Sequence, residues 1–302
     1  CVKGRFGFDY INHDGRITKP LIRRKDAPKK WDIQIDDKNI YDYFEETTWE
    51  NAIEVSAKGL TKTFNEEGPK GLAGFGSAKC SNEEAYLFQK LVRVGFGSNN
   101  VDHCTRLCHA SSVAALFEGL KSGAVSAPFN AATVADCIIV IGARPTENHP
   151  VAATYLKRAA KRGSKLIVMD PRKQGLTKYA EHHLQFKAGT DVAMLNAMLH
   201  TIVEEKLYDE QYVQGQTEGF EELKKSIKDF SPEKMEAICG IEAETLKEVA
   251  RIYANSEKSI IFWGMGVSQH VHGTDNARCL IALALSTGQV GRDGTGSVSY
   301  TH

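Results

Sequence analysis

The chain has 302 residues, a length that suggests about two domains. Hydrophobic residues make up 42% of it and charged residues 25%, which is ordinary for a globular protein whose core needs no disulfide bonds. Lysine plus arginine and aspartate plus glutamate both number 38, so the charge balance gives no support for a nucleic-acid or membrane-surface partner.

The cysteines are odd in number and scattered, which argues against the disulfide framework of a secreted protein. They are Cys1, Cys80, Cys104, Cys108, Cys137, Cys239 and Cys279. The sequence shows no secretory leader and no apolar run long enough to span a bilayer. We therefore expect a cytoplasmic protein with one or two thiols that bind metal. Because the chain starts at a cysteine rather than a methionine, we also expect a fragment or a processed chain.

In the first part of the chain, residues 1 to about 45 are expected to form short strands and loops, with a turn at residues 12–15. Thr48, followed by an acidic residue, predicts the start of an amphipathic helix that runs to Leu60. A buried strand is expected over residues 70–76. A helix capped by Ser81 or Asn82 is expected over residues 83–94.

From residue 136 onward, buried strands alternate with helices. Almost continuous apolar runs at 136–142, 165–169 and 258–264 predict strands buried on both faces, and a further strand is expected near 183–186. Helices are predicted over 150–162, from 191 onward, and over 217–227, 232–239, 243–254 and 276–285. The predicted fold class is α/β with a parallel sheet.

Ligands of such sheets bind outside the carboxyl ends of the strands, which places residues 142–149 and 170–172 at one rim. No G-x-G-x-x-G follows the first strand, so an NAD site within this chain is poorly supported. Asp170 is positioned to accept hydrogen bonds from ribose hydroxyls. A plain exit from strand to turn is the more common explanation of an Asp-Pro-Arg sequence.

Residues 98–115, S-N-N-V-D-H-C-T-R-L-C-H-A-S-S-V-A-A, lie where a polar loop meets an apolar helix that Ser111 and Ser112 can cap. A thiol near a helix N-terminus is favoured as the thiolate that a metal ligand or a nucleophile requires, whereas a lone cysteine is more often a small buried hydrophobe. A zinc site built from Cys104, Cys108 and His109 fits poorly, because no second cysteine pair stands at zinc-finger spacing.

The same segment resembles the active-site segment of molybdenum- or tungsten-dependent formate dehydrogenases, which belong to the molybdopterin oxidoreductase (DMSO reductase) family. The resemblance covers about residues 1–298, with the greatest likeness to the large subunit of soluble NAD-dependent enzymes. It rests further on the segments C-V-K-G, S-A-K-C-S-N-E-E, G-A-R-P-T-E-N-H-P, V-M-D-P-R, A-G-T-D-V-A-M-L-N and I-F-W-G-M-G-V-S-Q-H. It implies Rossmann-like α/β domains after a small β-rich N-terminal piece, and two molybdopterin guanine dinucleotides that hold one metal.

The resemblance also implies roles for single residues. Cys108 would ligate molybdenum or tungsten, His109 would line the formate site as proton acceptor or donor, and Arg278 would bind the formate carboxylate through its guanidinium fork. Without the resemblance, Arg278 is a snorkelling surface residue and His109 a structural histidine. Cys1 resembles the last cysteine of a 4Fe–4S site, and Lys3 would lie between cluster and pterin.

The pterin dinucleotides would be held mainly at strand-end loops. The implied cofactor-binding residues are Lys3, Lys79, Cys80, Asn82, Gly142, Arg144, Glu147, Asn148, His149, Asp170, Arg172, Gly189, Asp191, Gly264, Met265, Gly266 and Gln269. The implied domains are the end of an iron–sulfur domain (1–47), a Rossmann-like domain that binds one pterin guanine dinucleotide (104–278), and a further α/β domain composed of 48–103 and 279–302.

The implied reaction is oxidation of formate to CO2, with electrons passing through the 4Fe–4S cluster to flavin- and iron–sulfur-containing diaphorase-type subunits that reduce NAD. Neither nucleic acid nor a membrane segment is implied. Two alternatives stay open. An assimilatory nitrate reductase would share fold and cofactor. A cofactor-free structural subunit of a respiratory complex should lose the Cys-His pair and the pterin loops.

Overall fold

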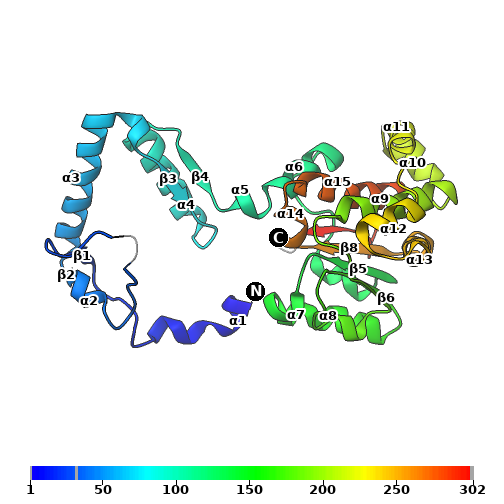
Figure 1. The fold of residues 1–302 in the computed structure, drawn as a ribbon, viewed down its shortest axis with the longest axis horizontal. Coiled ribbons are helices and arrows are strands. Elements are labelled where there is room, and N and C mark those ends of the chain that lie inside the picture. Colours follow the sequence, from blue (N-terminus) through cyan, green and yellow to red (C-terminus); the bar gives the residue numbers. More distant parts are fainter. Residues whose placement is uncertain (1, 31–32, 300–302) are drawn as a thin grey trace. The chain divides into compact units, whose positions relative to one another are not determined.

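The computed structural model describes residues 2–30 and 33–299, which divide between two compact units (Figure 1). The N-terminal unit is Lys3–Cys104, and the sheet unit starts at Thr105. Among the described residues, no helix has both the length and the apolar character that a membrane crossing requires.

The sheet unit is built on five parallel strands in the order β7-β6-β5-β8-β9. Their bounds are Cys137–Ile141 for β5, Lys165–Met169 for β6, His182–Leu184 for β7, Ser259–Trp263 for β8 and Gly296–Ser299 for β9. In β5 and β8 every residue is buried, as expected for strands covered on both faces. The predicted α/β class with a parallel sheet is thus confirmed.

Side chains of the strands alternate between two cores. Ile139 and Ile141 of β5 lie in one core and Ile138 and Val140 in the other. The first core is closed by α6 (Ala110–Leu120), α9 (Asp191–Glu204), α12 (Pro232–Cys239), α13 (Ala243–Asn255) and α15 (Gly273–Ser286). The second is closed by α8 (Pro150–Lys161) and a 3-10 turn at Phe129–Thr133, so helices cover both faces of the sheet (Figure 1).

Most predicted helices and strands of this unit are present with bounds shifted by a few residues. The helix expected at 217–227 is shorter, as α11 (Phe220–Ser226), and α10 (Glu210–Gln216) precedes it. Neither α10 nor β9 is predicted by the sequence pattern. One-turn helices α5 (Thr105–Cys108), α7 (Pro145–Asn148) and α14 (Met265–Ser268) occupy stretches expected as loops.

Helices α6 and α15 approach closely because glycines lie at the contact. A Cβ on Gly119 of α6 would come within 2.8 Å of Cγ2 of Ile281 in α15. At the other end, a Cβ on Gly273 would lie 2.0 Å from the carbonyl oxygen of Ser268. Both values are below the separation that real Cβ atoms tolerate. The contact of α6 with α15 therefore depends on Gly119, and the turn from α14 into α15 depends on Gly273.

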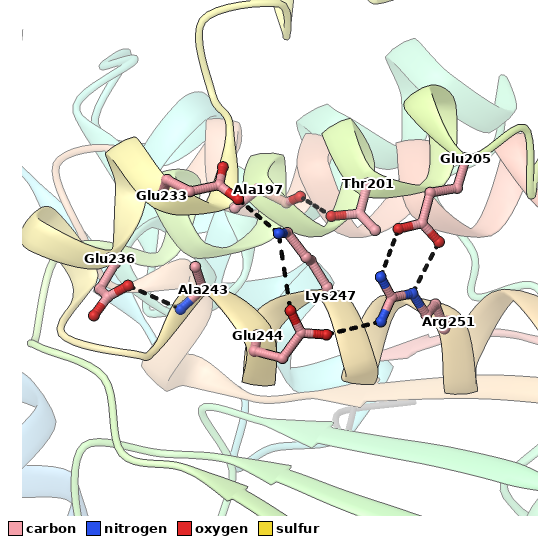
Figure 2. Close-up of polar contacts among 9 residues, drawn as sticks. All are labelled: Ala197, Thr201, Glu205, Glu233, Glu236, Ala243, Glu244, Lys247 and Arg251. Carbon is pink, nitrogen blue, oxygen red and sulfur yellow. Dashed lines mark hydrogen bonds and ion pairs between the residues drawn. The ribbon is translucent and has the colours of Figure 1, made fainter.

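Helices α9, α12 and α13 are joined on their outer side by ion pairs (Figure 2). The Arg251 guanidinium donates to Glu205 at 2.8 and 2.9 Å and to Glu244 at 2.9 Å. Lys247 Nζ lies 2.6 Å from Glu233 Oε1 and 3.9 Å from Glu244 Oε2. Solvent screens these ion pairs at the surface, so each one adds little to stability.

The N-terminal unit contains two small sheets: antiparallel β1 (Leu21–Arg23) with β2 (Phe44–Glu46), and parallel β3 (Gly74–Gly76) with β4 (Val101–His103). Its helices are α1 (Val2–Phe6), α2 (Ile40–Tyr43), α3 (Trp49–Glu67) and α4 (Asn82–Lys90). Thr48 caps α3 as predicted, and Ser81 forms a capping box with Glu84 at the start of α4. The described residues of this unit bury just two hydrophobic side chains, Leu72 and Val92.

Several predictions differ from the structure here. The buried strand expected over residues 70–76 is limited to β3, which follows a 3-10 turn at Pro69–Gly71, and its Phe75 is exposed. The first residues form α1 and a 3-10 turn at Phe8–Asn12 rather than strands. Phe6, Phe8 and Tyr10 are all exposed, so the apolar residues that suggested a strand do not form one buried face. Residues 279–299 lie in the sheet unit, and their predicted grouping with 48–103 in one domain stays a prediction. They lie there because α15 runs through residue 279 without a break, and β9 pairs with β8.

Candidate functional site at the carboxyl edge of the sheet

Because all five strands are parallel, their carboxyl ends lie along one edge of the sheet, where ligands of such folds bind. The loop after β5 continues into α7, and the loop after β6 contains Asp170 and Gln174. The loop after β8 contains α14, and α9 begins beyond β7. Most of the predicted cofactor-binding residues of the sheet unit therefore stand at this edge.

The two central loops of the edge touch through glycines. Gly142 has φ +58°, and a Cβ there would lie 2.7 Å from the backbone of Gly266 and Val267. The Gly266 N–H donates to Gly142 O at 2.9 Å, and a Cβ on Gly264 would lie 2.8 Å from that same oxygen. Packing between the loops accounts for these glycines. Their contact with a cofactor stays a prediction.

Cys108 lies beside the loop after β8. It is the last residue of α5, its side chain is half-buried, and its Sγ lies 3.2 Å from Sδ of Met265, the first residue of α14. The sulfur predicted to bind metal and a residue predicted to contact the pterin are thus neighbours, although 157 positions separate them in the chain.

His109 is 4% exposed and belongs to a chain of hydrogen-bonding groups. Trp263 Nε1, which can only donate, donates to Ser112 Oγ at 2.9 Å. Ser112 Oγ lies 2.5 Å from Ser268 Oγ, which lies 3.4 Å from Nδ1 of His109. One arrangement that satisfies every member of this chain has Ser112 donating to Ser268 and Ser268 donating to His109. In that arrangement a neutral His109 ring carries its proton on Nε2.

Ser111 and Ser112 do not cap α6. The helix begins at Ala110 with His109 as the N-cap residue and no side-chain cap. Ser111 Oγ instead donates to the carbonyl oxygen of Ser268 at 2.9 Å. The two hydroxyls therefore fasten the first turn of α6 to α14 and β8, and so fix the position of the Cys-His pair against the edge of the sheet.

Asp170 is 7% exposed and is already engaged. Its Oδ1 accepts from the Arg172 N–H at 2.8 Å, and its Oδ2 accepts from Gln174 Nε2 at 3.2 Å. Gln174 Nε2 also donates to the carbonyl oxygen of Ala143 at 2.7 Å, which links the loops after β5 and β6. These bonds are those of a strand exit. The ribose contact predicted for Asp170 is not needed to explain them, and the Arg172 side chain is exposed.

Several buried polar atoms at this edge have no hydrogen-bond partner among the described residues. They are Arg144 Nε, Thr146 Oγ1, Gln174 Oε1 and Asp191 Oδ2. Asp191 is 2% exposed at the first position of α9, and burial raises the pKa of its carboxyl group. Acceptors of this kind suit the N–H and O–H groups of a guanine and a ribose, and an arginine N–H suits a phosphate, so these residues fit a nucleotide-containing cofactor.

The remaining predicted residues of the edge are less deeply placed. Glu147 pairs with Arg144, and Asn148 is exposed at the end of α7. Burial lowers the pKa of His149. Gly189 has φ +82° in the turn before α9, and Gln269 is exposed after α14. Nothing in their geometry tests a cofactor contact, which stays a prediction for each.

Arg278 is not brought to Cys108. Its guanidinium lies 2.6 Å from Glu118 Oε2 and 2.7 Å from Asp275 Oδ1. Glu118 stands eight residues beyond the first residue of α6, on the order of 12 Å along the helix axis from the end that carries Cys108 and His109. The predicted contact of Arg278 with formate stays a prediction. The sequence pattern gives no sign of Glu118, because 160 positions separate the two residues.

The other predicted residues lie in the N-terminal unit or outside the described residues. Cys1 is outside them. Lys79 and Cys80 are on the exposed loop 77–81, and Asn82 is the first residue of α4. The ammonium group of Lys79 beside Lys3 lowers the pKa of Lys3. The structure thus brings together two cations that are both predicted to contact the cofactor.

Sequence reasoning missed Gln174, Thr146 and Ser268. Gln174 and Thr146 are polar residues among several in strand-end loops, and no feature of the sequence marks them as buried. Ser268 lies inside the segment I-F-W-G-M-G-V-S-Q-H that the resemblance identified. The signal that could have found it is its position one helical turn after Met265.

The family model described as molybdopterin oxidoreductase matches residues 16–302. F420-dependent formate dehydrogenase subunit alpha of Methanocaldococcus jannaschii is 40% identical over 296 residues, and formate dehydrogenase H of Escherichia coli is 36% identical over 301. Each match covers 98% of this chain, which spans 41% and 40% of these relatives. Acetylene hydratase from Pelobacter acetylenicus has a similar fold, with a TM-score of 0.79 and 25% identity over 98% of this chain and 38% of that one.

Proposed function

Because this chain belongs to the molybdopterin oxidoreductase family, we propose that it is part of the catalytic subunit of a formate dehydrogenase and supplies its metal-binding thiolate. The observation that carries the proposal is the contact of Cys108 with Met265 at 3.2 Å, next to the oriented ring of His109. Relatives of this chain bear the name formate dehydrogenase in two organisms, at 40% and 36% identity.

Cys108 has the chemistry that the role requires. A thiolate is a soft ligand, and the half-buried side chain stands where a metal held at the edge of the sheet would meet it. The pterin-bound molybdenum or tungsten would supply the two-electron redox chemistry. Asp191, Gln174 and Thr146 would accept hydrogen bonds from a guanine dinucleotide, and Arg144 would donate to its phosphates.

His109 would act on the substrate through Nε2. Oxidation of formate to CO2 releases one proton and two electrons. With Nδ1 accepting from Ser268, the neutral ring presents Nε2–H as a donor that orients a formate oxygen. Ser268, Ser112 and Trp263 are positioning residues, because each acts through the next one rather than on formate itself.

Arg278 would serve a different purpose from the one predicted. Its ion pairs join α15 to Glu118 on α6. We therefore assign it to holding α6, whose first turn follows the Cys-His pair. Electrons would leave through a 4Fe–4S cluster that includes Cys1, with Lys3 beside it, toward partner subunits that reduce NAD in the cytoplasm. A relative named F420-dependent provides the alternative acceptor.

The test uses the full-length protein purified under native conditions. We expect molybdenum or tungsten, an oxidised pterin released as a fluorescent product, and formate oxidation. Cys108→Ser should abolish the activity, and the matched variant Cys279→Ser, which changes a half-buried thiol on α15, should retain it. Absence of both metal and pterin from the full-length protein would refute the proposal that it is a formate dehydrogenase. It would favour the structural subunit instead.

Assays with several substrates separate the remaining alternatives. Nitrate reduction without formate oxidation would identify the nitrate reductase. The acetylene hydratase structure shows that a similar fold carries a protein named for another reaction, so the fold alone does not fix the substrate. Parallel assays with NAD and F420 as acceptors identify the electron partner.

A further inference from the structure

Two exposed cysteines of the N-terminal unit lie on either side of one peptide group. Cys80 is on the loop 77–81 between β3 and α4, and Cys104 directly follows β4. The Ala78 N–H donates to Cys104 Sγ at 3.2 Å, and Cys80 Sγ donates to the Ser77 carbonyl oxygen at 2.9 Å. The oxygen of Ser77 and the nitrogen of Ala78 belong to the same peptide unit.

These contacts limit the separation of the two sulfurs. The O and N atoms of one peptide group are about 2.3 Å apart, so Cys80 Sγ and Cys104 Sγ can be no more than about 8 Å apart. The loop 77–81, which carries Cys80, is short. It is anchored by β3 at one end and by the Ser81–Glu84 capping box of α4 at the other. Because the Ser77 carbonyl and the Ala78 N–H point to opposite sides of the peptide group, a bond between the two sulfurs requires residues 78–80 to change conformation.

The surroundings favour thiol chemistry over metal binding. His103 Nδ1 lies 3.9 Å from Cys104 Sγ, but no three His, Cys, Asp or Glu side chains converge on a metal position in the described part of the chain. The other thiols provide a contrast. Cys137 and Cys239 are fully buried, and burial raises the pKa of Cys137 to about 12. Thiols in that state react slowly.

We propose that Cys80 and Cys104 are a redox-sensitive thiol pair that oxidises reversibly to a disulfide. One thiol, as its thiolate, attacks a low-molecular-weight disulfide such as oxidised glutathione, and one glutathione leaves as a thiol. The second protein thiol then attacks the mixed disulfide, the S–S bond between Cys80 and Cys104 forms, and the second glutathione leaves. The protein loses two hydrogen atoms, and the oxidant gains them.

The bond would restrain a loop that carries predicted cofactor contacts. Lys79 precedes Cys80 and lies beside Lys3, while Cys104 stands four residues before Cys108. Oxidation would therefore fix the Lys79 ammonium relative to the strand that leads to the metal-binding thiol. This consequence for activity rests on the proposed function, whereas formation of the disulfide does not.

The experiment treats the full-length protein with oxidised glutathione, alkylates the remaining thiols and digests with trypsin without reduction. Trypsin cleaves after Lys79, Lys90, Arg93, Arg106 and Lys121. Cys80, Cys104 and Cys108 are then on the separate peptides 80–90, 94–106 and 107–121. We expect a linked species of 80–90 with 94–106, lighter by two hydrogen atoms than the reduced pair. The corresponding alkylated peptides should be lost, and dithiothreitol should restore them.

Variants show whether the pair is specific. Cys80→Ser and Cys104→Ser should each abolish the link and leave a glutathione adduct on the remaining thiol, and Cys279→Ser should leave the link intact. Glutathione adducts on both peptides without a link would overturn the proposal, as would a link from 80–90 to 107–121. Formate oxidation should fall on oxidation and recover with dithiothreitol. A linked protein with an unchanged rate would refute the effect on activity, and an inactive protein that still forms the link would refute only the proposed function.

Discussion

The two units of this chain use the same kinds of elements with very different burial. In the sheet unit, β5 and β8 are covered on both faces and two continuous cores surround them. In the N-terminal unit, β3 and β4 have three residues each, and Phe75 of β3 is 83% exposed. Parallel strands are stable when both faces are covered, so the comparison shows where the stability of this chain resides.

The largest expected effect comes from separating the units. A protein of residues 105–302 should unfold cooperatively in urea, because the buried side chains of both cores come from that part. A protein of residues 1–104 should show no cooperative transition, since Leu72 and Val92 are its buried hydrophobic side chains among the described residues. Circular dichroism during urea titration measures both. A sharp transition in the 1–104 protein would contradict the comparison.

The next effect concerns the glycine contact at the edge of the sheet. Gly142→Ala combines a positive φ with a Cβ at 2.7 Å from neighbouring backbone, and should lower the free energy of unfolding by about 3 kcal/mol. Gly219→Ala is the matched control, because Gly219 has φ +78° and open space around the added Cβ. It should cost about 1 kcal/mol. Equal losses in the two variants would show that backbone conformation alone matters at Gly142.

Ser112→Ala should destabilise the sheet unit by about 2 kcal/mol, because it leaves the buried Trp263 N–H and the Ser268 hydroxyl short of a partner. Thr201→Val removes another buried hydroxyl, which bonds just the Ala197 carbonyl oxygen of its own helix, and should cost less. Urea unfolding measures both. In the full-length enzyme, Ser112→Ala should also lower kcat for formate while the metal content stays unchanged. A parallel loss of metal would show that the hydrogen bonds from Trp263 to His109 only support the fold.

A smaller effect is expected for the pair formed by Arg278 and Glu118. Arg278→Gln and Glu118→Gln should each lower the free energy of unfolding by about 1 kcal/mol or less. The double variant should lose no more than Arg278→Gln alone, since that change already removes the ion pairs with both Glu118 and Asp275. The KM for formate should be unchanged. A large increase in KM for Arg278→Gln alone would instead support the predicted contact of Arg278 with the formate carboxylate.

The smallest effect is the acid sensitivity of the network in Figure 2. Lys247 lowers the pKa of Glu233 from 4.5 to about 2. Because the folded pKa lies below the unfolded value, the stabilisation is complete above about pH 4.5 and is lost as the pH falls toward 2. The unfolding difference between Glu233→Gln and the parent should be under about 1 kcal/mol at pH 7 and shrink below pH 4.5. A constant difference across that range would exclude the ion pair as its source.

The sequence predicts the sheet unit well because its strands are apolar on both faces, a pattern that survives without knowledge of partners. It does not predict β9, whose pattern Gly-Ser-Val-Ser has one apolar residue and depends on pairing with β8. The same reason explains the errors at the site. The Cys-His segment can be identified locally, whereas the partners of Ser111, Ser112 and Arg278 come from distant positions that no local pattern reveals.

The approach of Gly119 to Ile281 has a consequence for how homologous chains diverge. A larger residue at 119 requires a smaller one at 281, or the helix pair must separate and carry the start of α6 away from the sheet. Substitutions at these two positions are therefore expected to co-vary among related proteins. The residues found together at these two positions would then indicate, from sequences alone, how closely the two helices approach.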